Sequence, residues 1–350
     1  MKLPATTRVT LGFTLIELLV VVAIIALLIS ILLPSLGRAR ATARAVKCGA
    51  QMNSVGKAVA AYLTENTATY PPSYWYPNPD GTYDFLNQPT DHPAGYAHWS
   101  WFLFGYAKDL KAFTCPEFEY GGLSRTNPGK LQNRWIDGQV DQNGNTTPAG
   151  ASLEDKQAPF MAFTANAAIM PRNKFTVADA LADGGSGQRL NVFVRQSTIK
   201  RESGTILMTE FNTHWQTMTA LDSSGNRVIK SHRPLSPYIG AGGGTDEYSW
   251  PRNGQIAKTS FGDLYDTKAL QSQEVNGGSL ITDGATQLNA IGRHHPGSVG
   301  YKGKNYGGTT NFAYVDGHVE RKNVVQTVGG AGAWEWGETY YSLTGNTSVR

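Results

Sequence analysis

Hydrophobic residues are densest near the start of the chain. From Phe13 to Leu33 the sequence runs for 21 residues, of which only Glu17 is charged. An α-helix of this length is roughly 30 Å long at ~1.5 Å per residue, enough to cross the hydrocarbon core of a bilayer. We therefore predict a membrane-spanning helix over residues 13–33. Its acid needs a partner, because an acidic residue at mid-membrane costs about 2.5–3.5 kcal/mol.

The helical pattern continues beyond this segment with a different distribution of apolar residues. From residue 34 to 66 they recur at spacings of three and four, which predicts an amphipathic helix. Its apolar stripe is expected to pack against the rest of the chain from Val46 onward. Pro34 together with Gly37 predicts a kink or a melted turn where the two segments meet.

The remaining residues, 67–350, alternate short apolar runs with turns rich in Gly, Pro, Asn and Asp. Strands are expected at 189–200 and 204–211. Residues 121–159 are expected to form an elaborated surface loop, and no element is assigned to 234–289. The predicted fold class is α+β, with a long N-terminal helix packed on a loop-rich C-terminal antiparallel β-sheet domain.

A hairpin is predicted near the C-terminus. Residues 311–315 have a strand-like alternation of side chains, and Asp316-Gly317 separates them from His318-Val319-Glu320. An Asp-Gly pair between two such runs favours a two-residue type I′ turn. The aromatic residues that follow could form a last strand or a surface patch: Trp334, Trp336, Tyr340 and Tyr341.

Composition and charge exclude one class of partner. Charged residues make up 17% of the chain and the formal net charge is +4. No block of Lys and Arg forms a stripe for phosphates, so we predict no nucleic-acid binding. Lys2 and Arg8 precede the apolar helix, which predicts a cytoplasmic N-terminus and an outward C-terminal domain.

The chain has two cysteines, Cys48 and Cys115. In an oxidising compartment the simplest expectation is one disulfide, because two distant thiols are too few ligands for a metal. Such a bond would contribute roughly 4 kcal/mol on the loop-entropy estimate.

The segment Gly12-Phe13-Thr14-Leu15-Ile16-Glu17-Leu18-Leu19-Val20 resembles the processing signal of type IV pilins and type II secretion pseudopilins. The resemblance implies that a prepilin peptidase cuts after Gly12 and methylates the new N-terminal amine of Phe13. It also implies that Glu17 pairs with the Phe13 amine of a neighbouring subunit, so that each charge offsets the other's cost in lipid. The alternative is an ordinary signal anchor.

The resemblance extends further along the chain. Cys48, Asn53, Tyr62 and Pro71, followed by Phe113-Thr114-Cys115-Pro116, are similar to large planctomycete-type pseudopilin-like proteins with an H-x9-DG motif near the C-terminus. Here the motif residues would be His294, His295, Asp316, Gly317 and His318. Twenty residues separate His295 from Asp316, where the family has nine.

Candidate chemistry outside the N-terminus is sparse. Two histidines and Asp316 could bind zinc. However, the turn already explains Asp316, and an exposed strand residue such as His318 needs no ligand. Asp141, Asn143 and Asn145 alternate as in a calcium loop but lack its other acids, so a turn is the better interpretation. We predict no catalytic residues, no cofactor and no metal.

These observations predict a structural subunit of a type IV pilus-like or type II secretion pseudopilus fibre. It would be a single-pass inner-membrane protein, with its outer domain periplasmic or extracellular. The implied partners are the prepilin peptidase/methyltransferase, other pilin or pseudopilin subunits, the inner-membrane assembly platform and membrane lipid. Two alternatives stay open: a low-copy minor pilin acting as an adhesin or cargo- or carbohydrate-binding module, and a membrane-tethered hydrolase or metal enzyme.

Overall fold

The computed structural model falls into two compact units, residues 1–43 and 44–350, and each is described here by itself. The described residues are 14–80, 82, 84, 88–89, 95–173, 191–221, 224–235, 287–297, 300–301, 304–305, 307–328, 334–337, 340–341 and 348–349. The predicted region 234–289 therefore lies mostly outside the described residues.

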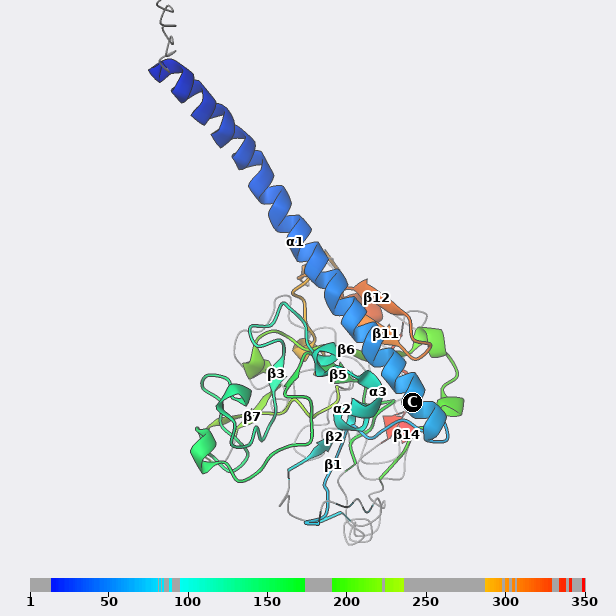
Figure 1. Cartoon of the computed structure of the whole chain (residues 1–350). Helices are drawn as coiled ribbons and strands as arrows, with labels where there is room; N and C mark the ends of the chain where they lie inside the picture. Colours follow the sequence, from blue (N-terminus) through cyan, green and yellow to red (C-terminus); the bar gives the residue numbers. More distant parts are fainter. Residues whose placement is uncertain are drawn as a thin grey trace, which may run out of the picture. The chain divides into compact units, whose positions relative to one another are not determined.

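One long helix, α1 (Leu15–Glu65), supplies residues to both units (Figure 1). Pro34 lies inside it, and the helix is continuous on both sides, so the melted turn allowed by the sequence is absent. The helix starts in a capping box, since Thr14 and Glu17 bond each other's backbone N–H groups. It ends at Glu65, just before Thr67 and Ala68 adopt positive φ.

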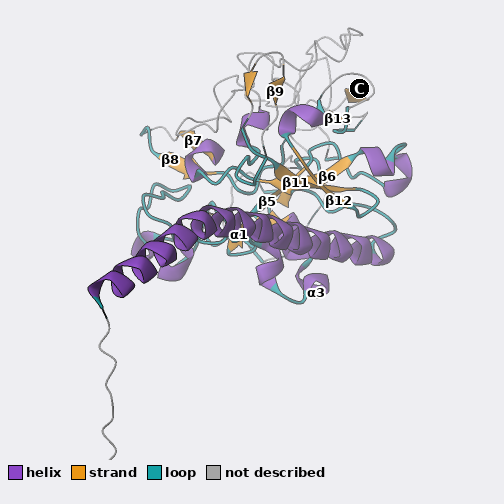
Figure 2. Ribbon diagram, turned by 90° about the horizontal axis from the view of Figure 1, so that it is seen from above, coloured by secondary structure: helices purple, strands orange, loops and turns teal. Residues whose placement is uncertain are grey.

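The second unit is built on a four-stranded antiparallel sheet with the order β12-β11-β6-β5 (Figure 2). Its strands are β5 (Phe163–Ala165), β6 (Ile206–Glu210), β11 (Thr310–Tyr314) and β12 (Val319–Lys322). Every residue of β5, β6 and β11 is buried, whereas β12 forms the more exposed edge. The predicted strand at 204–211 is thus confirmed as β6.

The described residues also form five two-stranded antiparallel sheets: β1 (Tyr74–Trp75) with β2 (Ala97–His98), β3 (Leu123–Ser124) with β4 (Phe160–Met161), β7 (Thr219–Leu221) with β8 (Arg227–Ile229), β9 (Gly300–Tyr301) with β10 (Lys304–Asn305), and β13 (Tyr340–Tyr341) with β14 (Ser348–Val349). The short helices are α2 (Trp99–Phe102), α3 (Phe104–Ala107) and the 3-10 turns Leu110–Phe113, Gln132–Arg134, Pro148–Gly150, Gln196–Thr198, Glu202–Gly204, Trp215–Met218, Gln287–Ala290 and Val324–Thr327. The predicted α+β fold class is confirmed.

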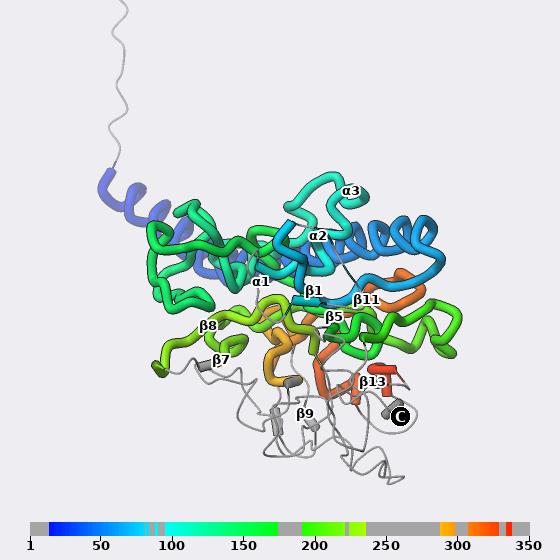
Figure 3. The backbone as a smooth tube through the Cα atoms, turned by 90° about the horizontal axis from the view of Figure 1, so that it is seen from below, coloured from blue at the N-terminus to red at the C-terminus, as the bar shows by residue number. Residues whose placement is uncertain are grey.

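The second half of α1 packs on the domain through one face. Its larger buried residues recur at spacings of three and four: Ala45, Cys48, Met52, Val55, Val59 and Leu63. The stripe was predicted to begin at Val46, but Val46 is 65% exposed and Ala45 is buried in its place. At the last turns of the helix, Tyr62 contacts Tyr106 of α3 edge-on, and α3 lies beside this end of the helix (Figure 3).

Two other expectations are wrong. Residues 189–200 were expected to form a strand, but their described part has only an isolated bridge at Arg195 and a 3-10 turn. The segment 121–159 was expected to be a surface loop, yet it buries a polar network that includes Arg125, Asn127 and Asp155. Hydrogen bonds within the network replace the ladder bonds that a regular sheet would supply.

The C-terminal hairpin is confirmed, with a different turn. Gly317 N–H donates to Tyr314 O, and Tyr314 N–H donates to His318 O. A type I′ turn would require a positive φ at Asp316. Among the described residues other than glycine, positive φ occurs at Thr67, Ala68 and Lys108, and Asp316 is not one of them. The loop therefore has three residues, and Gly317 takes the left-handed position at φ 92°. Downstream, Trp334 and Trp336 are buried in the core and do not form a surface patch.

Candidate functional site

Glu17 lies in the first turn of α1, in the unit formed by residues 1–43. Its Oε2 accepts hydrogen bonds from Thr14 N at 2.8 Å and Thr14 Oγ1 at 2.7 Å. Both bonds reach the same oxygen, and among the described residues no hydrogen bond reaches Oε1. The predicted processing residues Gly12 and Phe13 lie outside the described residues.

Around Glu17 the helix is apolar and uncovered. Large hydrophobic side chains from Leu15 to Leu36 are 46–78% exposed. It is the one described helix long and apolar enough to cross a membrane. Apolar surface of this extent needs lipid or other helices around it.

A second carboxylate, Glu210, lies in the other unit under opposite conditions. It is the last residue of β6 and is fully buried. Thr310 Oγ1 donates to its Oε2 at 2.7 Å, and Asn311 Nδ2 donates to its Oε1 at 3.0 Å. The Asn311 amide also donates to Ala45 O, so one side chain joins Glu210 to α1. Gly49 allows this approach, because a Cβ there would lie 3.3 Å from Asn311 Oδ1.

Two adjacent histidines complete the surroundings of Glu210. His295 Nε2 lies 2.9 Å from Glu210 Oε2, and His294 Nε2 lies 3.4 Å from the same oxygen. Burial acts to raise the pKa of Glu210, but the two histidines outweigh it and hold that pKa well below its usual range. The backbone of His295 pairs with Thr309, directly before β11, and this pairing fixes the ring beside the end of β6.

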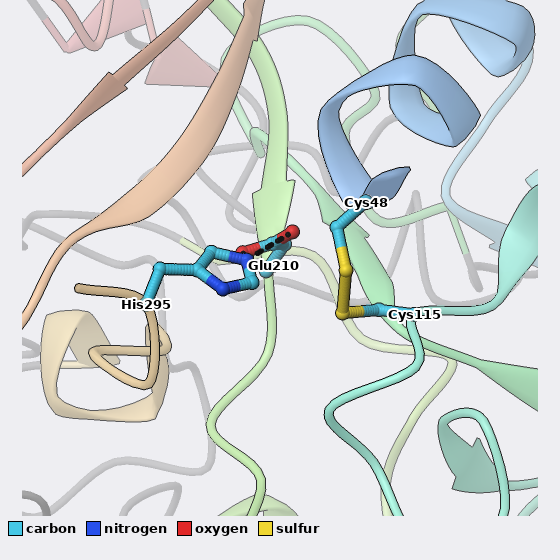
Figure 4. A group of neighbouring side chains, drawn as sticks. All are labelled: Cys48, Cys115, Glu210 and His295. Carbon is cyan, nitrogen blue, oxygen red and sulfur yellow. Dashed lines mark hydrogen bonds and ion pairs between the residues drawn. A yellow bond between two sulfur atoms is a disulfide. The ribbon is translucent and has the colours of Figure 1, made fainter. Parts of the chain in front are cut away.

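The predicted disulfide between Cys48 and Cys115 is present and lies beside this carboxylate (Figure 4). Both cysteines are fully buried. Their sulfurs, a Glu210 oxygen and a His295 ring nitrogen all lie within 4.8 Å of one another. The disulfide joins α1 to the segment after α3. Its two sulfurs, a carboxylate and an imidazole are thereby held together in the core.

The C-terminal motif residues do not form one site. His294 and His295 contact Glu210, whereas Asp316, Gly317 and His318 lie at the hairpin turn. There the His318 ring stacks on Tyr314 and its Nδ1 lies 2.5 Å from Asp316 Oδ1. Burial acts to raise the pKa of Asp316, but the hydrogen bonds from His318 lower it overall. The group of metal-capable side chains found among the described residues contains neither Asp316 nor His318.

Sequence reasoning missed most of the residues around His295. Glu210, Thr310 and Asn311 were given no functional role. Glu210 is 85 residues from His295, 100 from Thr310 and 101 from Asn311, so no local spacing could have indicated these contacts.

The possible calcium loop is a turn. Asp141 Oδ1 accepts hydrogen bonds from Asn143 N and Asn145 N, at 2.9 and 2.8 Å. The Asn145 side chain donates to both carboxylate oxygens. An aspartate that accepts from the backbone two and four residues ahead stabilises a turn without an ion.

Comparison with known proteins identifies the N-terminal segment. Residues 8–33 match the family described as the prokaryotic N-terminal methylation motif. No curated protein and no solved structure matches the chain. The motif indicates a prepilin-like protein of the type IV pilin and pseudopilin kind, anchored in the membrane by its apolar helix. It favours a structural subunit over an enzyme, and it implies processing by a prepilin peptidase and assembly with other pilin subunits.

Proposed function

We propose that this protein is a subunit of a type IV pilus-like or type II secretion pseudopilus fibre. Prepilin peptidase/methyltransferase removes residues 1–12 and methylates Phe13, and an inner-membrane assembly platform then adds the subunit to the fibre. The leading observation is the methylation motif at residues 8–33, joined to a helix whose apolar surface is exposed on all sides. The domain beyond residue 44 would coat the fibre on its periplasmic or extracellular side.

Glu17 is the residue that assembly would depend on. A charge on an apolar helix in lipid is costly unless an opposite charge offsets it. Thr14 bonds only its Oε2, which leaves Oε1 for the N-terminal amine of Phe13 in a neighbouring subunit. Pairing with that amine would offset the cost of both charges and set the axial register between subunits.

Two variants separate this role from helix capping. Glu17→Gln keeps the size of the side chain and removes its charge, so we expect normal membrane insertion and a loss of fibre incorporation. Thr14→Ala removes the hydroxyl that bonds Glu17 but keeps the carboxylate, so we expect incorporation to persist.

The measurement is the amount of each variant in sheared or pelleted fibres, with the N-terminal mass checked in each. Normal incorporation of Glu17→Gln, or equal loss in both variants, would contradict the assembly role of the charge.

The alternative role is a low-copy minor pilin that acts as an adhesin or as a cargo- or carbohydrate-binding module. The size of the second unit, residues 44–350, favours it, because so large a domain would crowd a tight helical lattice. Five described tryptophans are buried and so cannot serve as exposed sugar platforms: Trp75, Trp99, Trp135, Trp334 and Trp336. Counting copies of the chain per isolated fibre separates a minor from a major subunit.

A further inference from the structure

The buried cluster beside the disulfide has the composition of a metal site. Cys48, Cys115, Glu210 and His295 each offer one ligand atom, and these atoms lie within 4.8 Å of one another. They come from four separate segments: α1, the loop after the first 3-10 turn, the end of β6, and the bridge before β11. All four residues are at most 2% exposed.

We propose that the chain with reduced cysteines binds one zinc ion at these four residues. The two cysteines then either form the disulfide or bind zinc, but not both at once. This inference goes beyond the proposed function and does not depend on it, because it concerns the isolated chain and requires no fibre.

The chemical types of the four ligands favour zinc. Two thiolates, an imidazole and a carboxylate suit zinc, which prefers four such ligands in a tetrahedron. At metal–ligand distances of about 2.0–2.3 Å, the ligand atoms of a tetrahedral site lie roughly 3.3–3.8 Å apart. The four atoms lie within 4.8 Å of one another, so the site needs the two sulfurs to separate and the ligands to draw closer around the ion.

The surroundings orient the ligands as an outer shell would. Thr310 and Asn311 hold the Glu210 carboxylate from both oxygens. The Nδ1 of His295 is buried, and no hydrogen bond to it occurs among the described residues. A buried ring nitrogen without a partner is costly, and a metal bond at Nδ1 itself would offset that cost.

Zinc binding and disulfide formation differ in their chemistry. Zinc binding displaces the two thiol protons into solvent and transfers no electrons. Disulfide formation removes two electrons and two protons from the thiols and reduces a disulfide oxidant to a dithiol. Because the sulfurs in a disulfide are no longer thiolates, zinc is expected to leave when the bond forms.

The test uses the full-length chain in detergent, either disulfide-bonded or reduced with a phosphine and then freed of it. Alkylation followed by mass measurement verifies the state of both cysteines. Cobalt(II) is the probe, because tetrahedral thiolate ligation produces visible d–d bands and a near-ultraviolet charge-transfer band. We expect the reduced chain to bind one cobalt ion, which zinc displaces, and the disulfide form to show neither band. Absence of the thiolate band in the reduced chain, or equal binding by the disulfide form, would overturn the proposal.

Two histidine variants test the ligand set. His295→Gln is expected to weaken zinc binding by at least about tenfold while the thiolate band remains. His318→Gln, at the hairpin turn, is the matched control and should bind zinc as the unaltered chain does. Equal zinc affinity in the unaltered chain, His295→Gln and His318→Gln would show that His295 is not a ligand. If His295→Gln does not fold, as judged by circular dichroism, Cys115→Ser decides, because loss of one thiolate should also weaken cobalt binding and diminish the charge-transfer band.

Discussion

The two halves of α1 have the same backbone conformation and opposite surroundings. In residues 15–33 only Glu17 is charged, apolar residues occupy every side of the helix, and all of these residues are exposed. Residues 44–65 carry one buried stripe, with polar and charged side chains on the other faces. Helical structure alone therefore does not decide what a helix does. The number of its faces that are apolar indicates whether it needs lipid and other helices or a single protein surface.

The two acids of these units show the same contrast. Glu17 has one local hydrogen-bonding residue, Thr14. Glu210 is fully buried and contacts Thr310, Asn311 and two histidines. A carboxylate in an apolar environment needs partners, and the domain supplies them for Glu210 from its own chain. For Glu17 we propose that a second subunit supplies the partner.

Removing the charge of Glu210 should give the largest effect. Glu210→Gln removes a fully buried charge to which Thr310, Asn311 and two histidines are fitted, so we expect the free energy of unfolding of the domain to fall by about 3–5 kcal/mol. Urea titration followed by tryptophan fluorescence measures it, because all eight tryptophans lie at or beyond residue 75. Glu17→Gln is the control and should change the same quantity by less than about 0.5 kcal/mol. Equal effects would mean that the two acids do not differ as described.

The two halves of α1 can be compared through one substitution in each. Met52→Ala removes a fully buried side chain, and we expect a loss of about 2–5 kcal/mol in the unfolding free energy. Leu28→Ala removes a side chain that is 55% exposed in the apolar half, and the domain should respond by less than about 0.5 kcal/mol. A large effect of Leu28→Ala on the unfolding of the domain would contradict its separation from the core.

Asp155 should contribute more to the stability of the domain in mild acid than at neutral pH. Burial raises the pKa of Asp155 to about 6, above the 3.8 of a free side chain. The folded state therefore binds more protons than the unfolded state between these values, and stability increases as pH falls through 6. The full contribution is on the order of 3 kcal/mol. About 1.3 kcal/mol of this contribution appears between pH 7 and pH 5, so the free energies of unfolding from urea titrations at these two pH values should differ by that amount more in the unaltered chain than in Asp155→Asn.

More acidic conditions reverse the trend through Glu210. The pKa of Glu210 is lowered in the folded state, so its contribution is complete above about 4.5 and is lost as pH falls below that value. Burial lowers the pKa values of His98 and His232 and acts against Asp155 between pH 7 and pH 5, so the comparison with Asp155→Asn decides. The same pH dependence in the unaltered chain and in Asp155→Asn would contradict the assignment for Asp155.

Replacing two glycines by alanine should change the free energy of unfolding by small amounts of opposite sign. Gly317 has φ 92° at the hairpin turn, and a Cβ there would meet nothing within 4 Å. We therefore expect Gly317→Ala to cost about 1 kcal/mol through backbone strain alone. Gly56 lies inside α1, and a Cβ there would also meet nothing within 4 Å. Gly56→Ala should therefore stabilise by up to about 1 kcal/mol. Equal signs for both variants, measured by urea unfolding, would contradict this explanation.

Elements with a strong local pattern could be predicted from the sequence. The helix was predicted to end at residue 66 and ends at Glu65. The strand before Phe211, the C-terminal hairpin and the Cys48–Cys115 disulfide were also predicted correctly. The start of the buried stripe on α1 was placed at Val46 instead of Ala45, because small residues such as Ala45 and Ala50 do not show from the sequence which side is buried.

The sequence by itself determined the helix, the apolar N-terminal segment with its single acid, and the methylation motif, because these depend on residues close together along the chain. Only the tertiary structure decided that Glu210 meets His295, Thr310 and Asn311 beside the disulfide. It also decided that the network around Asp155 is buried instead of forming a surface loop. Such contacts join residues that are far apart in sequence, and the free energy of burying a charge depends on all of its partners at once.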